Sequence, residues 1–227
     1  INEAGAMSSW IAAGTSYTNH DIEMIPIYLF YSRFGFQRIG DFAWAGADSQ
    51  SRGFLIGATA GRTTLAGEGL QHQDGHSHLM ASTIPNCKSY DPAYGYELAV
   101  IIEHGLKEMY RDKKNYFYYL TVTNERYVQP PKPKGKDVDA NIIKGMHRIS
   151  KTKKPQIRLL GSGAILNESI KAAEILSGFG IESEVWSVSS FNMLRKDGME
   201  VENENIKNPS NKAKESFVTE SFNEHDI

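Results

Sequence analysis

The sequence lacks the features that mark secreted, membrane-spanning or nucleic-acid-binding proteins. A single cysteine, Cys87, in 227 residues excludes an internal disulfide and fits a reducing compartment. We therefore expect a cytoplasmic protein in which Cys87 is a small buried side chain. No apolar run approaches the ~20 residues that span a bilayer, which argues against a membrane partner. The formal net charge of −2 argues against a nucleic-acid partner, because such proteins carry a basic face.

Residues 1–128 alternate between helical and extended patterns. Apolar residues recur at helical spacing over residues 3–14, 36–50 and 94–112. Continuous apolar and aromatic runs predict strands over residues 24–32, 54–60 and 116–123, and the first of these is expected to be buried on both faces. Strands that alternate with helices predict an α/β fold in which helices cover both faces of a parallel sheet.

The composition changes at residue 129. Three of the eight prolines lie in residues 129–139, and residues 129–154 hold eight Lys or Arg against two Asp, a balance of +6. Because such a stretch does not form a packed helix or a central strand, we expect an interdomain linker over residues 129–152. A non-catalytic interaction module that binds an acidic partner through this basic stretch is the alternative.

A second α/β unit is predicted over residues 153–227. A strand begins at Gln156, a helix follows over residues 165–178, another strand covers 183–190, and a polar tail begins at Asp197. The turn GSGAIL lacks the third glycine of a dinucleotide-binding motif, so a tight strand–helix turn explains it better. At the other end, a helical pattern begins two residues after Ile1 and no initiator Met is present, so we expect an internal piece of a longer protein.

Three of the seven histidines lie in the stretch GEGLQHQDGHSH, residues 67–78. Three interpretations are open: a metal site that activates water for hydrolysis, a segment that supplies acid–base groups and binds substrate, and a hydrated polar loop. The spacing of His72, Asp74, His76 and His78 matches no established ligand pattern. The metal site is therefore the least favoured interpretation, and the acid–base segment and the hydrated loop stay open.

Glu3 is a second candidate, because an acid within an apolar helix is costly to bury. Burial would raise its pKa and let it share a proton with a ring nitrogen of a ligand, whereas a helix-initiating glutamate is the simpler alternative. Several aromatic residues lie within or just after the first predicted strand: Tyr28, Phe30, Tyr31, Phe34 and Phe36. They are most simply core residues, but the carboxyl end of a strand is also where parallel sheets bind ligands.

Four longer stretches carry a resemblance to one family: INEAGAMSSWIAA, MIPIYLFYSRFGFQRIGD, RGFLIGATAGRTTLAGEGLQHQDGHSH and IPNCKSYDPAYGYE. The chain resembles, from Ile1 to about Ser190, the thiamine diphosphate-dependent decarboxylating component of homodimeric bacterial pyruvate dehydrogenase complexes. The resemblance implies a transketolase-like thiamine diphosphate-binding fold. Residues 1–128 would be the second half of the pyrimidine-binding middle domain, and residues 153–227 the first part of the C-terminal domain. The domain that holds the diphosphate and Mg would lie outside this chain.

The resemblance also implies roles for individual residues. Glu3 would hydrogen-bond the aminopyrimidine nitrogen and control the proton whose removal gives the reactive carbanion, and His72 would contact the substrate. Other residues would bind the cofactor: Ile1, Tyr31, Phe34 and Arg38. The remaining polar residues of the histidine segment would support the substrate loop: Glu68, Asp74, His76 and His78. No metal ligand is implied within the chain.

The implied activity is the oxidative decarboxylation of pyruvate, followed by reductive acetylation of a lipoyl group on the dihydrolipoyl acyltransferase partner. A homodimer is implied, with thiamine diphosphate and Mg as cofactors, and the chain alone would be inactive. Two alternatives stay open at this point: another transketolase-like thiamine enzyme, and a metallohydrolase that uses the segment from His72 to His78.

Overall fold

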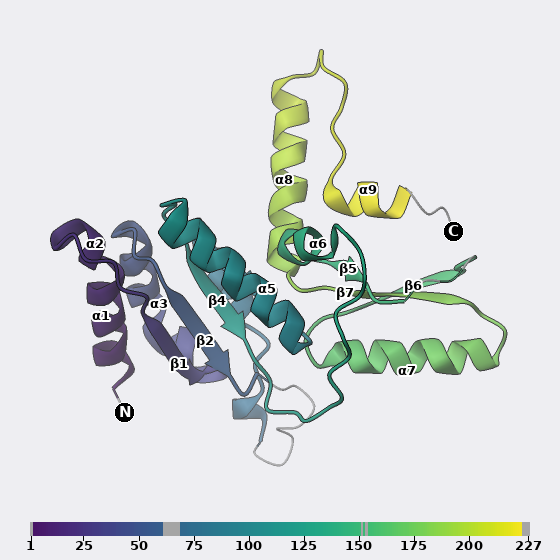
Figure 1. Cartoon of the computed structure of the whole chain (residues 1–227), viewed down its shortest axis with the longest axis horizontal. Helices are drawn as coiled ribbons and strands as arrows, with labels where there is room; N and C mark the ends of the chain where they lie inside the picture. Colours follow the sequence, from purple (N-terminus) through teal and green to yellow (C-terminus); the bar gives the residue numbers. More distant parts are fainter. Residues whose placement is uncertain (1, 61–68, 151, 153, 224–227) are drawn as a thin grey trace. The chain divides into compact units, whose positions relative to one another are not determined.

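The structure, a computed structural model, describes residues 2–60, 69–150, 152 and 154–223. The chain divides into two compact units, Ile1–Lys132 and Pro133–Ile227, which are described separately. Figure 1 shows their elements. Among the described residues, no helix combines the length and the apolar character that crossing a bilayer requires.

The first unit is built on a parallel sheet of four strands in the order β1-β2-β4-β3. The strands are β1 (Ile27–Tyr31), β2 (Phe54–Ala58), β3 (Cys87–Tyr90) and β4 (Phe117–Thr121). The helices are α1 (Glu3–Gly14), α2 (Ser16–Asn19), α3 (Ser32–Asp48), α4 (Ser77–Ser82) and α5 (Gly95–Leu106), with a 3-10 turn over Leu70–His72 and a π-helical turn over Lys107–Arg111. The predicted parallel α/β architecture is confirmed.

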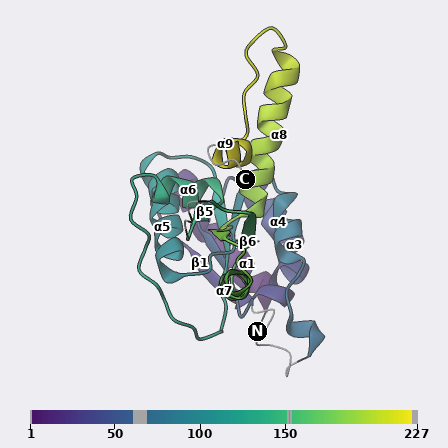
Figure 2. The same cartoon turned by 90° about the vertical axis from the view of Figure 1, so that its right-hand side faces the viewer.

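Alternate residues of the central strands face opposite helical layers. Leu55 and Tyr119 pack with α1 and α3 in the main core. On the other face, a Cβ atom added to Gly105 of α5 would lie 2.9 Å from the Phe54 ring, so α5 approaches the sheet closely at this glycine. Figure 2 shows α5 on one side of the sheet and α3 on the other. The expected helices on both faces are therefore present.

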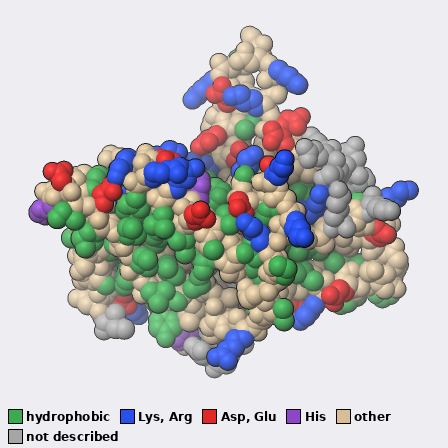
Figure 3. All heavy atoms as spheres, viewed as in Figure 1, with side chains coloured by type: hydrophobic (Ala, Val, Ile, Leu, Met, Phe, Trp, Pro, Cys, Tyr) green, Lys and Arg blue, Asp and Glu red, His purple; other side chains and the backbone are tan. Residues whose placement is uncertain are grey.

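The expectation that the first strand is buried on both faces is wrong. β1 lies at the edge of the described sheet, and Ile27, Leu29 and Tyr31 are 62%, 61% and 56% exposed. Figure 3 shows hydrophobic side chains gathered over the part of this unit where β1 and β2 lie. A continuous apolar run is typical of a strand that is buried on both faces, but the run does not identify the segments that cover it.

The second unit has a three-stranded sheet in the order β5-β7-β6. β6 (Ile157–Gly161) and β7 (Ser183–Ser187) are parallel, and β5 (His147–Arg148) is antiparallel to β7. The helices are α6 (Val138–Lys144), α7 (Ile165–Gly178), α8 (Phe191–Lys207) and α9 (Phe217–Asn223). Its small core contains Met146, Trp186, Val188 and Phe217.

Two segments of this unit are more ordered than the sequence suggested. α6 and β5 lie within residues 129–152, which we expected to be a linker, because the helix begins only after the prolines have ended. The predicted polar tail from Asp197 contains most of α8 and all of α9. Asp197 of α8 accepts a hydrogen bond at 2.7 Å from the backbone of Phe217, the first residue of α9, and so links the two helices. The GSGAIL turn is tight as expected, since a Cβ atom at Gly161 would lie 2.6 Å from the Cα atom of Leu166.

Candidate functional site

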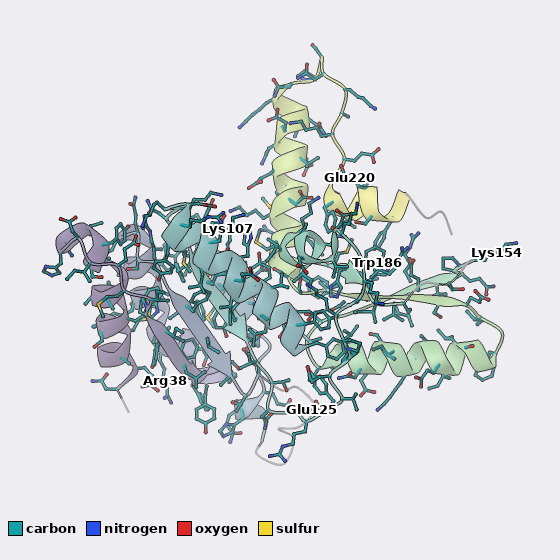
Figure 4. The ribbon with its side chains drawn as sticks, in the orientation of Figure 1. Arg38, Lys107, Glu125, Lys154, Trp186 and Glu220 are labelled. Atoms are coloured by element: carbon teal, nitrogen blue, oxygen red, sulfur yellow. The ribbon has the colours of Figure 1, made fainter. Side chains whose placement is uncertain are left out.

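A cavity of about 340 Å³ lies where the carboxyl ends of β1 and β2 meet the start of α1 and α3. Its lining is mostly apolar and aromatic, with one carboxylate and one guanidinium: Glu3, Tyr28, Leu29, Phe30, Tyr31, Phe34, Gly35, Arg38, Ala58 and Thr59. Figure 4 labels Arg38 on the side of the sheet toward which the arrowheads of β1 and β2 point. Open parallel sheets bind ligands at this edge, so the cavity is the candidate site.

Glycine at position 35 shapes the cavity wall. A Cβ atom there would lie 1.8 Å from the Phe30 ring, so only glycine lets α3 start directly after β1 while Phe30 packs beneath it. Phe30 in turn stacks on Tyr119, with ring centroids 6.0 Å apart and planes 9° from parallel. The aromatic wall is therefore rigidly backed by the core of the unit.

Glu3 enters the cavity from the first turn of α1. The helix is capped by Asn2, whose side chain accepts a hydrogen bond from the backbone of Gly5 at 3.1 Å. The Glu3 carboxylate pairs with the Arg38 guanidinium, and the side chain is 22% exposed. The hydrogen bond from Arg38 lowers the pKa of Glu3. Burial would have raised this pKa, and the structure shows the opposite shift because Arg38 is at hand and the carboxylate is not enclosed.

Arg38 also covers an aromatic ring that reaches the histidine segment. Its guanidinium carbon lies 4.9 Å from the ring centroid of Phe34. Phe34 contacts His72 edge to face, with centroids 5.3 Å apart and planes at 80°, and Tyr31 contacts the same imidazole at 6.2 Å and 72°. Four sequence-predicted residues are thereby joined to Glu3 in one contact network.

The other residues of the histidine segment point to different surroundings. Asp74 is buried and accepts hydrogen bonds at 3.1 Å from the backbone of His76 and of Ser77, at the start of α4. Burial would raise the pKa of Asp74, but these bonds and one from the Ser77 hydroxyl lower it. His76 is exposed, whereas His78 lies 2.7 Å from the Thr121 hydroxyl. Ile1 and Glu68 lie outside the described residues.

The geometry does not support the metallohydrolase alternative. The histidines at positions 72, 76 and 78 contact an aromatic pair, solvent and a strand end, respectively. Among the residues that the structure describes, no group of three or more His, Cys, Asp or Glu side chains is placed to hold a metal ion.

Two features at this edge were not identified from the sequence. Thr59 follows β2 with φ at +56°, a conformation that costs a β-branched residue about 1–3 kcal/mol and that is concentrated at functional sites. Thr121 ends β4 and is 1% exposed, and its hydroxyl is 2.6 Å from Asp91. Both residues lie near the carboxyl ends of predicted strands of a parallel sheet, and that position was the available signal.

Comparison with known proteins gives two matching family profiles. Residues 1–130 match the pyruvate dehydrogenase E1 component middle domain, and residues 145–224 match the transketolase-like C-terminal domain. The pyruvate dehydrogenase E1 component of Pseudomonas aeruginosa is 61% identical over 97% of this chain and 25% of that protein. That of Escherichia coli K12 is 50% identical over 99% of this chain and 26% of that protein. The chain thus spans about a quarter of the length of these relatives.

Solved structures show the same fold at much lower identity. A transketolase from Campylobacter jejuni matches with a TM-score of 0.66 and 18% identity, covering 82% of this chain and 27% of that one. A transketolase from Leishmania mexicana matches with a TM-score of 0.67 and 15% identity, covering 86% and 26%. The predicted transketolase-like fold is therefore confirmed.

Proposed function

The chain belongs to the family of the pyruvate dehydrogenase E1 component, and from this premise we propose that it supplies the pyrimidine side of a thiamine diphosphate site. The enzyme that contains it would decarboxylate pyruvate oxidatively and transfer the acetyl group to a lipoyl group of a dihydrolipoyl acyltransferase. One observation carries the proposal: the Glu3 carboxylate and the Phe34 ring line one cavity at the sheet edge, and the His72 imidazole contacts that same ring.

The residues present fit an aminopyrimidine ring. Such a ring is flat, largely apolar on its faces and polar at its nitrogens, and the cavity offers aromatic walls with a carboxylate at one end. When bound, thiamine diphosphate supplies an acidic ring carbon that adds to a 2-oxo acid and takes up the electrons released by decarboxylation. The protein supplies orientation and control of protons.

Glu3 is proposed to hold a proton against a pyrimidine nitrogen. Its carboxylate now has a guanidinium partner, and the pairing with Arg38 keeps its pKa low. A ligand ring that displaces water from the cavity would strengthen every electrostatic interaction there, including the one between Glu3 and the ring. Arg38, with a side chain 55% exposed, has room to move away from Glu3 as the ring enters.

Phe34, Tyr31 and His72 are proposed to act on the side of the cavity that faces the substrate. Phe34 presents a ring to the ligand, and the edge contact from His72 fixes the direction of the imidazole. An imidazole is the commonest general acid or base in enzyme active sites, so His72 is proposed to exchange a proton next to a carboxylate substrate such as pyruvate. Tyr31 restrains the same imidazole from a second direction.

The diphosphate and Mg are proposed to bind outside this chain, in another part of the full-length enzyme. The described part of the cavity wall contains no glycine-rich phosphate loop and is mostly apolar and aromatic. We propose that the cofactor lies between two subunits of a homodimer, that Glu68, Asp74, His76 and His78 support the substrate loop, and that Ile1 contacts the cofactor. The isolated chain is then expected to be inactive.

The first experiment is calorimetric titration of thiamine diphosphate with Mg into the full-length enzyme that carries this chain. We expect the wild type to bind and to decarboxylate pyruvate. Glu3→Gln keeps the shape of the side chain but cannot cycle a proton, so it should bind and lose about 10²- to 10⁴-fold in kcat. Glu103→Gln, an exposed change on α5, is the matched control and should behave as wild type.

Each negative result has a separate meaning. Absence of binding by the wild-type enzyme would reject the thiamine site altogether. Near-normal turnover of Glu3→Gln in an enzyme that binds the cofactor would leave the family activity intact and remove Glu3 from its proposed role. Decarboxylation without acetyl transfer to a lipoyl domain would reject the proposed partner.

A further inference from the structure

Three side chains form a hydrogen-bonded row at the carboxyl ends of β3 and β4. The Nε2 atom of His78 lies 2.7 Å from the Thr121 hydroxyl, and that hydroxyl lies 2.6 Å from Oδ1 of Asp91. Thr121 is the last residue of β4, and Asp91 directly follows β3. The His78 ring also lies against Tyr119, with centroids 5.2 Å apart. The row therefore connects the first turn of α4 to two adjacent strand ends.

Counting protons gives the row a direction. A hydroxyl has one proton to donate, and a carboxylate oxygen only accepts. The Thr121 hydroxyl therefore donates to Asp91, and its weaker alternative, the Tyr90 carbonyl at 3.4 Å, is also only an acceptor. The remaining bond to Thr121 has to be donated by Nε2 of His78. The row thus selects the histidine form that carries a proton on Nε2, as carboxylate partners do for histidines in other sites.

A second set of hydrogen bonds, centred on Asp74, fixes the same segment four residues before His78. Buried Asp74 accepts bonds from the backbone of His76 and Ser77 and from the Ser77 hydroxyl, which fixes the start of α4. His72 lies only two residues before Asp74, in the preceding 3-10 turn. Because so few residues separate them, the place of α4 on the sheet limits where His72 can lie.

We propose that Thr121 and Asp91 are positioning residues that fasten α4 to the sheet through His78 and thereby hold His72 over the Phe34 ring. This inference rests on the proposed function for the role of His72, but the fastening itself is a property of the fold. Neither Thr121 nor Asp91 lines the cavity, so both act through the histidine segment rather than on the ligand.

The test compares two substitutions at one position in the full-length enzyme. Thr121→Val keeps the shape of the side chain and removes the hydroxyl, whereas Thr121→Ser keeps the hydroxyl. Thr15→Val is the matched control, because Thr15 is also buried and its hydroxyl donates to the Ile11 carbonyl at 2.9 Å, away from α4. Hydrogen exchange of a peptide covering residues 72–82 reports the fastening without any reference to activity.

We expect amide exchange in residues 72–82 to be several-fold faster in Thr121→Val and unchanged in Thr121→Ser and Thr15→Val. We also expect kcat of Thr121→Val to fall about 10-fold or more with little change in the KM for pyruvate, because a displacement of ~1 Å costs as much as 10²-fold in rate. Thr121→Ser should retain most of the rate, which a role in packing alone would not explain.

Asp91→Ala provides the second measurement if Thr121→Val does not fold. It leaves the Thr121 hydroxyl without its carboxylate, and the same region should again exchange faster. Unchanged exchange in either variant, or an equal loss of kcat in Thr121→Ser and Thr121→Val, would overturn the inference. A wild-type enzyme without thiamine-dependent decarboxylation would instead refute the proposed function, while the exchange data would still decide whether the fastening exists.

Discussion

The carboxylates at the two ends of the sheet in the first unit differ in how many donors surround them. At the amino ends of β3 and β4, Glu108 is surrounded by donors: Lys88 at 2.6 Å, the Tyr118 hydroxyl at 2.7 Å and Lys114 at 3.2 Å. At the carboxyl ends, Glu3 has one described partner side chain, the half-exposed Arg38, and an open cavity beside it.

The difference separates a charge that holds the fold from a charge that is available to a ligand. The side chain of Glu108 is 6% exposed and its acceptor sites are occupied by its own chain. Glu3 lies at the wall of a cavity with aromatic sides, and its counter-ion is a long, half-exposed side chain. A buried carboxylate with several donors stabilises a structure, whereas one beside an open cavity can exchange its partner for a ligand.

The largest effect should follow from breaking the amino-end cluster. Glu108→Ala leaves Lys88, whose side chain is 12% exposed, without its buried counter-charge, and breaking such a pair costs about 3–5 kcal/mol in the free energy of unfolding. Glu3→Ala should lower the same quantity far less, because exposed ion pairs contribute little. Urea unfolding of the two variants measures both. Equal losses of unfolding free energy in the two variants would contradict the proposed difference between the two ends of the sheet.

The next effect belongs to the carboxyl end. Phe34→Ala removes the ring that the proposed cofactor would contact, and we expect thiamine diphosphate to bind about 10- to 100-fold more weakly, as loss of one aromatic contact commonly costs ~1–3 kcal/mol. Phe34 is only partly buried, so stability should change little. Phe179→Ala, at a ring that is 77% exposed in the second unit, is the control. A stability loss in Phe34→Ala as large as that of Glu108→Ala would mean that the ring belongs to the core.

A smaller effect is expected from pH. Burial by itself would raise the pKa of Glu108, but the bonds from Lys88 and Tyr118 outweigh it and lower this pKa below its ordinary 4.5. A lowered pKa in the folded state means that the cluster stabilises fully above pH 4.5 and that this contribution is lost as the pH falls through the lower folded value. The acid-side slope of stability should therefore be shallower in Glu108→Gln. An unchanged slope would contradict the proposed role of the cluster.

Sequence reasoning recovered the core of the fold but not its edges. The helix predicted over residues 94–112 is present as α5 and the π-helical turn, with Ile101, Gly105 and Met109 buried. β3 was missed because Cys87–Tyr90 is short and mixes polar with apolar residues, which hides a strand in the periodicity. Strand order and neighbours are set by contacts between distant segments, and no local pattern reports them.

In the candidate site, too, the sequence identified residues but not their contacts. The sequence grouped the histidines at positions 72, 76 and 78 because they are close along the chain, yet the 3-10 turn and α4 direct them to different surroundings. It also identified Glu3 without Arg38 as its ion-pair partner, since the two residues are 35 positions apart. Contacts between residues far apart in sequence decide a pKa, so the expected upward shift of Glu3 could not be corrected before the structure was known.

The smallest predicted effect tests whether a buried hydroxyl at the carboxyl end of the sheet serves to bind a ligand. The buried hydroxyl of Tyr28, on the cavity wall, has no hydrogen-bond partner among the described residues, and burial together with the Glu3 charge raises its pKa. If the hydroxyl serves nothing, Tyr28→Phe should raise the free energy of unfolding by up to about 1 kcal/mol, because an unpaired buried donor is costly. Thermal unfolding and cofactor titration, read together, decide the matter. Weaker cofactor binding without a gain in stability would mean that the hydroxyl binds a group present only in the complete site. The contrast with the amino end of the sheet, where Glu108 has all its donors within the chain, would then hold for a neutral group as well as for a charged one.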